Sequence, residues 1–163
     1  MPKLGALAAD AAEILKTQNV KISVAESSTG GLISAALLAV PGASAYFEGG
    51  SVVYTLTSRK EILRITRNDV EGLEPLTEAM VLKFAEKAAD QLGTTWGIAE
   101  LGVAGPTGAR YGHPPGISVI GVFGPNPAAT TIETHSDDRE ANMWQFTSAA
   151  LNLLTNQLKQ HYS

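Results

Sequence analysis

The 163-residue sequence contains no cysteine. Disulfides, thiolate metal ligands and a cysteine nucleophile are therefore excluded. Histidine is also scarce, because His113, His135 and His161 are the only three and form no spaced pair of the kind that binds zinc. We expect no metal site, and we expect His113 and His135 to be solvated surface residues.

Long apolar runs and a basic charge excess are missing as well. No apolar stretch approaches the roughly 20 residues that a membrane-spanning helix needs, and the start of the chain lacks the apolar core of a signal peptide. The net charge is −4 and the lysines and arginines are scattered, whereas a nucleic-acid-binding protein usually has a basic face. We expect a cytoplasmic protein with no membrane partner and no direct nucleic-acid partner.

The patterns that are present predict one α/β domain over residues 1–163. Hydrophobic residues make up 44% of the chain, which is enough for one packed core. Apolar residues at helical spacing and short β-prone runs alternate along the first two thirds, and a hairpin follows. We predict a three-layer α/β/α sandwich with a mixed, mostly parallel sheet. The expected helices are 4–17, 32–40, 58–65, 77–92 and one opened by residues 137–138; the expected strands are 20–25, 51–54, 95–103, 117–123 and 130–135.

The segment from Glu26 to Gly31 is the centre of the predicted site. A strand ends there, the chain turns through Ser27, Ser28, Thr29 and two glycines, and a helix begins. Such a turn directs backbone N–H groups to one point beyond the strand and adds hydroxyl oxygens, which suits an acyl or phosphate group. The alternative is that Ser28 or Thr29 only caps the helix and the glycines only turn the chain.

Two further segments follow strands and are expected to meet the first. One runs from Tyr54 to Lys60 and brings a phenol, hydroxyls and two cations; the other is the glycine-rich loop 102–116. Ligands of open α/β sheets gather beyond the carboxyl ends of the strands. A serine nucleophile with a nearby lysine or tyrosine is an established alternative to the Ser-His-Asp triad.

Glu100 lies inside an apolar strand-like run. A carboxylate there must be paired, or its pKa must rise. It orients a cation from the Arg59-Lys60 segment or contacts substrate; the alternative is that it lies near the strand end and reaches water.

Five segments, in order and spacing, resemble one known family. Residues 25–31, A-E-S-S-T-G-G, resemble the A-E-S-C-T-G-G motif of the CinA C-terminal domain family. Residues 41–47 resemble its P-G-S-S-A-x-F, residues 50–54 its G-x-V-x-Y, residues 102–106 its G-I-A-G-P, and residues 138–139 part of its G-D-R.

The resemblance implies an α/β/α fold and the hydrolysis of nicotinamide mononucleotide to nicotinate mononucleotide and ammonia, a step of pyridine nucleotide salvage. It implies a stand-alone domain, no cofactor and a homo-oligomer, most simply a dimer. Ser27 would be the nucleophile, paired with a lysine, and N–H groups near residues 29–31 would stabilise the oxyanion. The catalytic residues are then Ser27, Lys60 and Tyr54; the substrate-binding residues are Glu26, Ser28, Thr29, Gly30, Gly31, Arg59, Glu100, Gly102, Ala104, Gly105, Thr107 and Arg139.

The chain departs from the family pattern at four positions. Arg59 stands where the lysine is expected, Leu101 replaces a threonine, Met143 replaces a second arginine and Ser28 replaces cysteine. Arginine is a poor general base because it stays protonated. Lys60, one residue later, is therefore the expected base, with Tyr54 as a relay. The alternatives are a non-catalytic relative that binds a nucleotide-like ligand, and an interaction module.

Overall fold

The structure is a computed structural model that describes residues 3–110 and 112–163. The helices are α1 (Leu4–Gln18), α2 (Leu32–Leu38), α3 (Leu56–Glu61), α4 (Glu78–Leu92) and α5 (Arg139–Tyr162), with a short 3-10 helix at Ala43–Ala45. The strands are β1 (Ile22–Glu26), β2 (Phe47–Val52), β3 (Trp96–Val103), β4 (Ile117–Phe123) and β5 (Ala128–Glu133). No helix in these two ranges combines the length and the hydrophobicity needed to cross a membrane.

The five strands form one mixed sheet in the order β2-β1-β3-β4-β5. The pairs β1–β2 and β1–β3 are parallel, whereas β3–β4 and β4–β5 are antiparallel. Four of the five strands therefore point the same way, and β4 alone is reversed. This confirms the predicted mixed, mostly parallel sheet, including the hairpin of its last two strands.

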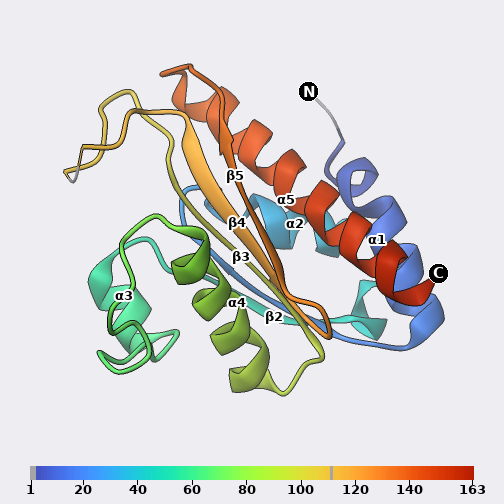
Figure 1. Cartoon of the computed structure of the whole chain (residues 1–163). Helices are drawn as coiled ribbons and strands as arrows, with labels where there is room; N and C mark the ends of the chain where they lie inside the picture. The colour runs from blue at the N-terminus through green and yellow to red at the C-terminus, as the bar shows by residue number, and fades with distance from the viewer. Residues whose placement is uncertain (1–2, 111) are drawn as a thin grey trace.

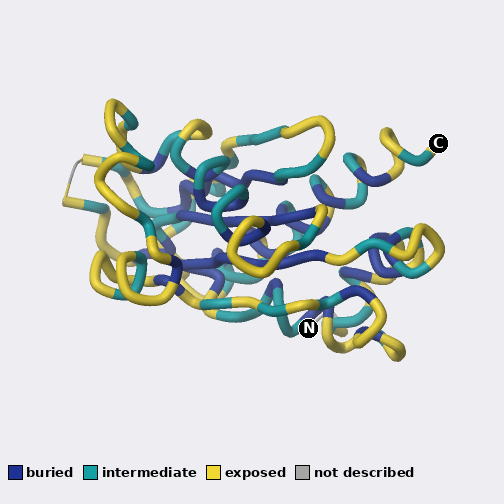
Figure 2. Tube along the Cα trace, turned by 90° about the horizontal axis from the view of Figure 1, so that it is seen from below, coloured by how far each residue is buried: buried dark blue, intermediate teal, exposed yellow. Residues whose placement is uncertain are grey.

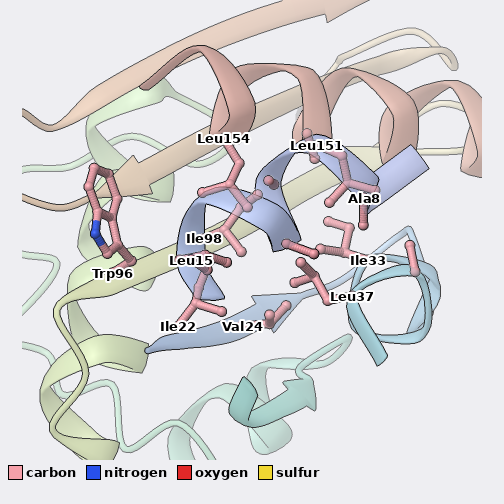
Figure 3. Close-up of a cluster of buried hydrophobic side chains, with 14 of the residues drawn as sticks. Ala8, Leu15, Ile22, Val24, Ile33, Leu37, Trp96, Ile98, Leu151 and Leu154 are labelled. Carbon is pink, nitrogen blue, oxygen red and sulfur yellow. The ribbon is translucent and has the colours of Figure 1, made fainter. Parts of the chain in front are cut away.

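Helices cover both faces of the sheet, so the predicted three layers are confirmed (Figure 1). One face packs against α1, α2 and α5 through a cluster that includes Leu15, Ile98 and Leu154 (Figure 3). The other face packs against α4 through a cluster that includes Val81, Phe84 and Ala99. The central strands are accordingly buried between partly exposed helices (Figure 2), which is why β3 and β4 read as near-continuous apolar runs.

The helix ends follow the capping residues of the sequence. The Thr77 hydroxyl accepts the Met80 N–H at 3.2 Å and Gly93 ends α4 in the left-handed region, as expected. Asp138 caps α5 by accepting the Ala141 N–H at 3.2 Å.

Two predicted elements were wrong by four residues at one end, and the other predicted bounds agree with the structure to within two residues. The second strand begins at Phe47 and not at residue 51, because Gly49 and Gly50 pair with β1 instead of leading up to it. The third helix spans Leu56–Glu61 and not 58–65, because Thr55 and Ser58 form a capping box that starts it earlier.

The segment Tyr46–Val53 is apolar and contains two glycines, which also favours the predicted homo-oligomer, and its central part, β2, is an edge strand of the sheet. Its two end residues, Tyr46 and Val53, are buried in the chain's own core and cannot contact a partner. The homo-oligomer stays a prediction, and β2 is the part of that segment left at the sheet edge.

The three predicted site segments meet at one end of the sheet. Glu26 ends β1 and lies beside Val52, which ends β2, and beside Glu100 near the end of β3. Because these three strands are parallel, the turn after β1, the start of α3 and the loop after β3 all leave the sheet at the same edge.

Candidate functional site

The turn after β1 is held from below by the carboxylate of Glu26. Its Oε1 accepts the Ile33 N–H at 3.1 Å and the Thr29 hydroxyl at 2.6 Å, and its Oε2 accepts the Ser34 N–H at 3.0 Å. Glu26 has no exposed surface. Its role is therefore to join the end of β1 to the start of α2, and the prediction that it contacts substrate is wrong for this conformation.

Glu100 holds the same turn from the neighbouring strand. Its Oε1 accepts the N–H groups of Ser27 at 3.2 Å and Thr29 at 3.0 Å, and its Oε2 is hydrogen-bonded to the hydroxyls of Ser28 and Ser118. Burial raises the pKa of the Glu100 carboxyl, and the hydrogen bonds from Ser28, Thr29, Ser118 and Ser27 oppose that rise.

The predictions for Glu100 need correction. The side chain is 0% exposed, so it neither reaches water nor has a surface to offer a ligand. Its partners are hydroxyl and N–H groups, and no cation of the Arg59-Lys60 segment is among the ion pairs or hydrogen bonds recorded for it. The expectation that the carboxyl group is paired or has a raised pKa is confirmed, and the partners that the structure gives it are hydroxyl and N–H groups.

Above this turn lies a pocket of about 530 Å³ that contains Ser27. Eight of the predicted site residues line it: Ser27, Tyr54, Arg59, Gly102, Ala104, Gly105, Thr107 and Arg139. Ser27 is only 3% exposed. Among the described residues no buried side-chain oxygen or nitrogen lacks a hydrogen-bond partner, and no partner of the Ser27 hydroxyl is recorded, so this oxygen opens to the pocket.

Three guanidinium groups, those of Arg59, Arg110 and Arg139, line the pocket. Arg139 donates to the Gly105 carbonyl and, at 3.0 Å, to the Tyr54 hydroxyl, so it ties the loop after β3 to the segment after β2. Arg59 donates to the Val53 carbonyl at 3.1 Å and lies over the Phe84 ring. No aspartate, glutamate, lysine or histidine is among the described lining residues, so the pocket is positively charged in an acidic protein.

Arg110 was missed by our sequence analysis. It lies in a glycine-rich loop, where a guanidinium beside flexible backbone is a recognisable signal for an anionic ligand. Tyr111, which belongs to the same predicted loop, lies outside the described residues.

Lys60 does not line the pocket that holds Ser27. It is exposed and borders a neighbouring hollow with Ile65, Met80 and Phe84. Successive residues of a helix point about 100° apart, so the residue after Arg59 on α3 faces elsewhere. The structure therefore does not support Lys60 as the base for Ser27.

The described lining residues of the pocket include none of Ser28, Thr29, Gly30 and Gly31; Ser28 and Thr29 are buried, whereas Gly30 is exposed. The expected oxyanion donors also need correction, because the Thr29 N–H is bonded to Glu100 and the Gly30 N–H donates to the Ser27 carbonyl at 3.0 Å. Among the described residues, no acceptor is recorded for the N–H groups of Ser28 and Gly31. The Ser28 N–H, directly after Ser27, is our candidate donor.

A larger hollow of about 640 Å³ lies between the loop before β4 and the end of β5. It is lined by prolines and by Glu133, His135, Ser136 and Asp137, and no lysine or arginine is among its described lining residues. Within the described parts of the chain, no group of three or more histidine, aspartate or glutamate side chains could hold a metal ion. We take the Ser27 pocket as the candidate functional site, because it combines a serine hydroxyl with three guanidinium groups.

Comparison with known proteins decides the family. The family model for the CinA C-terminal domain matches residues 5–158. The chain belongs to the CinA C-terminal domain family. A CinA-like protein from Parasynechococcus marenigrum is 38% identical over 126 residues, which is 77% of this chain and 30% of that relative. A CinA-like protein from a Synechococcus strain is 35% identical over 147 residues, 88% of this chain and 35% of the relative.

Solved structures agree on the CinA fold. A CinA superfamily protein from Klebsiella pneumoniae superposes with a TM-score of 0.88 at 24% identity, covering 98% of this chain and 99% of the other. The competence/damage-inducible protein CihA from Agrobacterium tumefaciens gives a TM-score of 0.83 at 25% identity, with 98% of each chain covered. The chain spans about a third of the length of the curated CinA-like relatives it matches.

Proposed function

We propose that this CinA-family chain binds a pyridine nucleotide amide, such as nicotinamide mononucleotide, and hydrolyses its carboxamide through Ser27. The observation that carries the proposal is the pocket itself, which places one open serine hydroxyl beside three guanidinium groups and no acidic side chain.

The guanidinium groups suit the phosphate of a mononucleotide. Arginine presents a planar set of donors that matches phosphate oxygens, and charge-assisted bonds of this kind are stronger than neutral ones. Arg110 and Arg139 lie on the exposed rim, while Arg59 is half-buried, so a ligand would place its phosphate at the rim and its amide toward Ser27.

In the reaction, the Ser27 oxygen attacks the carboxamide carbon and the carbonyl oxygen becomes an oxyanion, for which the Ser28 N–H is the donor we assign. The proton that leaves Ser27 ends on the departing nitrogen, so ammonia is released and an ester remains on Ser27. Water then cleaves the ester and returns the proton to Ser27. Tyr54, hydrogen-bonded to Arg139, is the relay that we expect for these transfers.

A second function, ligand binding without turnover, is favoured by the absence of a base. Lysine, histidine, aspartate and glutamate are all missing among the described lining residues, and Arg59 stays protonated. In that case the chain keeps the pocket of its family and responds to a nucleotide without consuming it.

One experiment separates the two functions. Ammonia release is measured for nicotinamide mononucleotide, its riboside and the dinucleotide, and the thermal shift of the protein is measured with the same compounds. We expect a stabilising shift and ammonia from the mononucleotide. Lys60→Ala is the matched control and should leave both readouts unchanged, whereas Arg59→Ala should weaken binding.

The results of the ammonia assay and the thermal shift distinguish hydrolysis from binding without turnover. A thermal shift without ammonia in the wild type, followed by ammonia from Arg59→Lys, would establish the binding function and reject the enzyme. Neither ammonia nor a thermal shift with any of the three compounds would reject both functions.

A further inference from the structure

Two buried carboxyl groups lie side by side beneath Ser27. Glu26 and Glu100 face each other across the parallel β1–β3 pair, and both are 0% exposed. The Thr29 hydroxyl lies 2.6 Å from Glu26 Oε1 and 3.1 Å from Glu100 Oε1. Among the described residues, no ion pair with a cation is recorded for either group. Two adjacent buried carboxyl groups without a cation do not both stay ionised.

The hydrogen-bond partners of the two carboxyl groups differ. Both oxygens of Glu26 accept backbone N–H groups, from Ile33 and Ser34, and an N–H can only donate. Glu100 differs, because its Oε1 accepts two N–H groups while its Oε2 meets only hydroxyls. A hydroxyl can accept as well as donate, so Glu100 Oε2, which faces no N–H donor, is the oxygen that best accommodates a proton, whereas each oxygen of Glu26 faces an N–H and only Oε1 also meets a hydroxyl, that of Thr29.

The contacts of the Ser118 hydroxyl favour a proton on the same oxygen of Glu100. Ser118 Oγ lies 3.0 Å from Glu100 Oε2 and 3.2 Å from the Leu101 carbonyl oxygen, and it has one proton for two acceptors. If Oε2 carries a proton, Ser118 donates to the carbonyl and accepts from the carboxyl group, and both contacts are satisfied. Burial, which raises the pKa of Glu100, acts in the same direction.

We propose that Glu100 is a positioning residue of the Ser27 turn and acts as a neutral carboxylic acid beside the buried Glu26. Its Oε1 fixes the N–H groups on both sides of Ser28, which sets where the Ser27 hydroxyl and the Ser28 N–H point. The inference concerns the chain's own residues and holds whichever of the two proposed functions is right.

The groups that face the buried Glu26–Glu100 pair come from several elements. From β1 and its turn come Glu26 and the Ser27–Thr29 backbone, and from β4 comes Ser118. On the covering helices, α2 contributes the N–H groups bound to Glu26, and the cation at the start of α5, Arg139, is bonded to Gly105 and Tyr54. Glu26 is thus the titratable partner that these contacts identify.

The test compares two amide substitutions. Glu100→Gln keeps an oxygen for the two N–H groups and gives the hydroxyls an NH₂ in place of the acid, so we expect its melting temperature at neutral pH to equal or exceed that of the wild type. In Glu26→Gln, the side-chain NH₂ would face a backbone N–H group, and two donors cannot form a hydrogen bond with each other. We therefore expect a clearly lower melting temperature for this variant. Equal losses in both variants, or a larger loss in Glu100→Gln, would overturn the assignment.

The pH dependence has a definite sign. The pKa of Glu100 is raised above its ordinary value of 4.5, so the folded chain holds a proton that the unfolded chain releases. The stability that this bound proton contributes is fully present below pH 4.5 and is lost as the pH rises through the folded-state pKa of Glu100. Relative to Glu100→Gln, the wild type should therefore lose stability with rising pH. The proposal is contradicted if the difference in stability between the wild type and Glu100→Gln does not change with pH, or if the wild type gains stability relative to Glu100→Gln as the pH rises.

Two readouts do not depend on stability. At about pH 7, where ordinary carboxyl groups are ionised, infrared spectra of the wild type should show a carboxylic-acid C=O band that Glu100→Gln lacks.

Because the chain has no cysteine, Ser27→Cys supplies a single thiol at the turn. Its alkylation rate by iodoacetamide should change less than twofold when Glu100→Gln is added, and should shift severalfold with Glu100→Leu, which frees the turn.

An ionised Glu100 gives the opposite results. The wild type would show no acid band, and Glu100→Gln would speed the alkylation, because removal of a nearby negative charge favours the thiolate. Failure of the amidohydrolase proposal leaves these readouts unaffected, since none of them uses substrate.

Discussion

Ser27→Ala is expected to lower ammonia release from nicotinamide mononucleotide by a factor on the order of a thousand or more, because it removes the attacking oxygen and what remains is binding and oxyanion stabilisation. The hydroxyl opens to the pocket and makes no recorded hydrogen bond that holds the fold. Ligand affinity and melting temperature should therefore stay close to those of the wild type. The measurement is a steady-state ammonia assay beside a binding titration.

Ser28→Ala is the matched control for this loss. Ser28 is the adjacent serine, but its hydroxyl is turned to Glu100 and does not line the pocket. It should lower stability more than Ser27→Ala and turnover much less. A residual rate in Ser27→Ala within tenfold of the wild type, or a larger loss of turnover in Ser28→Ala, would remove Ser27 from its assigned role.

Gly102→Ala is expected to damage both the turn and the pocket. A Cβ at this position would lie 2.5 Å from Ser28 Oγ, 2.7 Å from Glu100 Oε2 and 3.1 Å from the Ile117 carbonyl oxygen. All three atoms are held in the sheet or in the buried network, so the turn must shift. We expect a loss of about 1–3 kcal/mol in the free energy of unfolding, with a matching loss of ligand affinity, measured by urea unfolding and titration.

Two further variants test whether the contact with Ser28 causes the loss in Gly102→Ala. Gly49→Ala, also in a strand, would meet only the end of the half-exposed Leu92 side chain, which can move aside, so it should cost far less. In a Ser28→Ala background the atom at 2.5 Å is gone, so Gly102→Ala should cost less there than in the wild type, as a double-mutant cycle would show. Equal costs in both backgrounds would mean that the Ser28 contact is not the reason.

Most of the architecture could be predicted from periodicity and capping. Residues 117–123 form a strand as expected, and the helix after Thr77 begins and ends where its caps place it. The start of β2 could not be predicted, because Gly49 and Gly50 are poor strand formers on their own. They are used where the backbone comes close to Leu92 and Ser34 in the folded chain, a contact that no local pattern reveals.

The sequence predicted many of the residues that line the pocket, but not the buried hydrogen-bond network beneath it. The rule that ligands bind beyond the ends of parallel strands brought Ser27, Tyr54 and the loop after β3 together correctly. The position of Lys60 depended on where α3 begins, and a shift of one helical residue turns a side chain by about 100°. The pairing of Glu26 with Glu100 depends on the register of two strands 70 residues apart in sequence, which the sequence alone does not encode in any readable pattern.

The guanidinium groups of the Ser27 pocket are proposed to recognise the phosphate of a pyridine nucleotide amide. Calorimetric titration of the Ser27→Ala variant, which cannot turn over its ligand, tests this with nicotinamide mononucleotide and with the riboside that lacks the phosphate. We expect the mononucleotide to bind at least about tenfold more tightly than the riboside, as charge-assisted bonds of about 1.5–3 kcal/mol require, and we expect Arg110→Ala to reduce this difference in affinity. Equal affinities for the two compounds, or a difference unchanged by Arg110→Ala, would contradict the proposal.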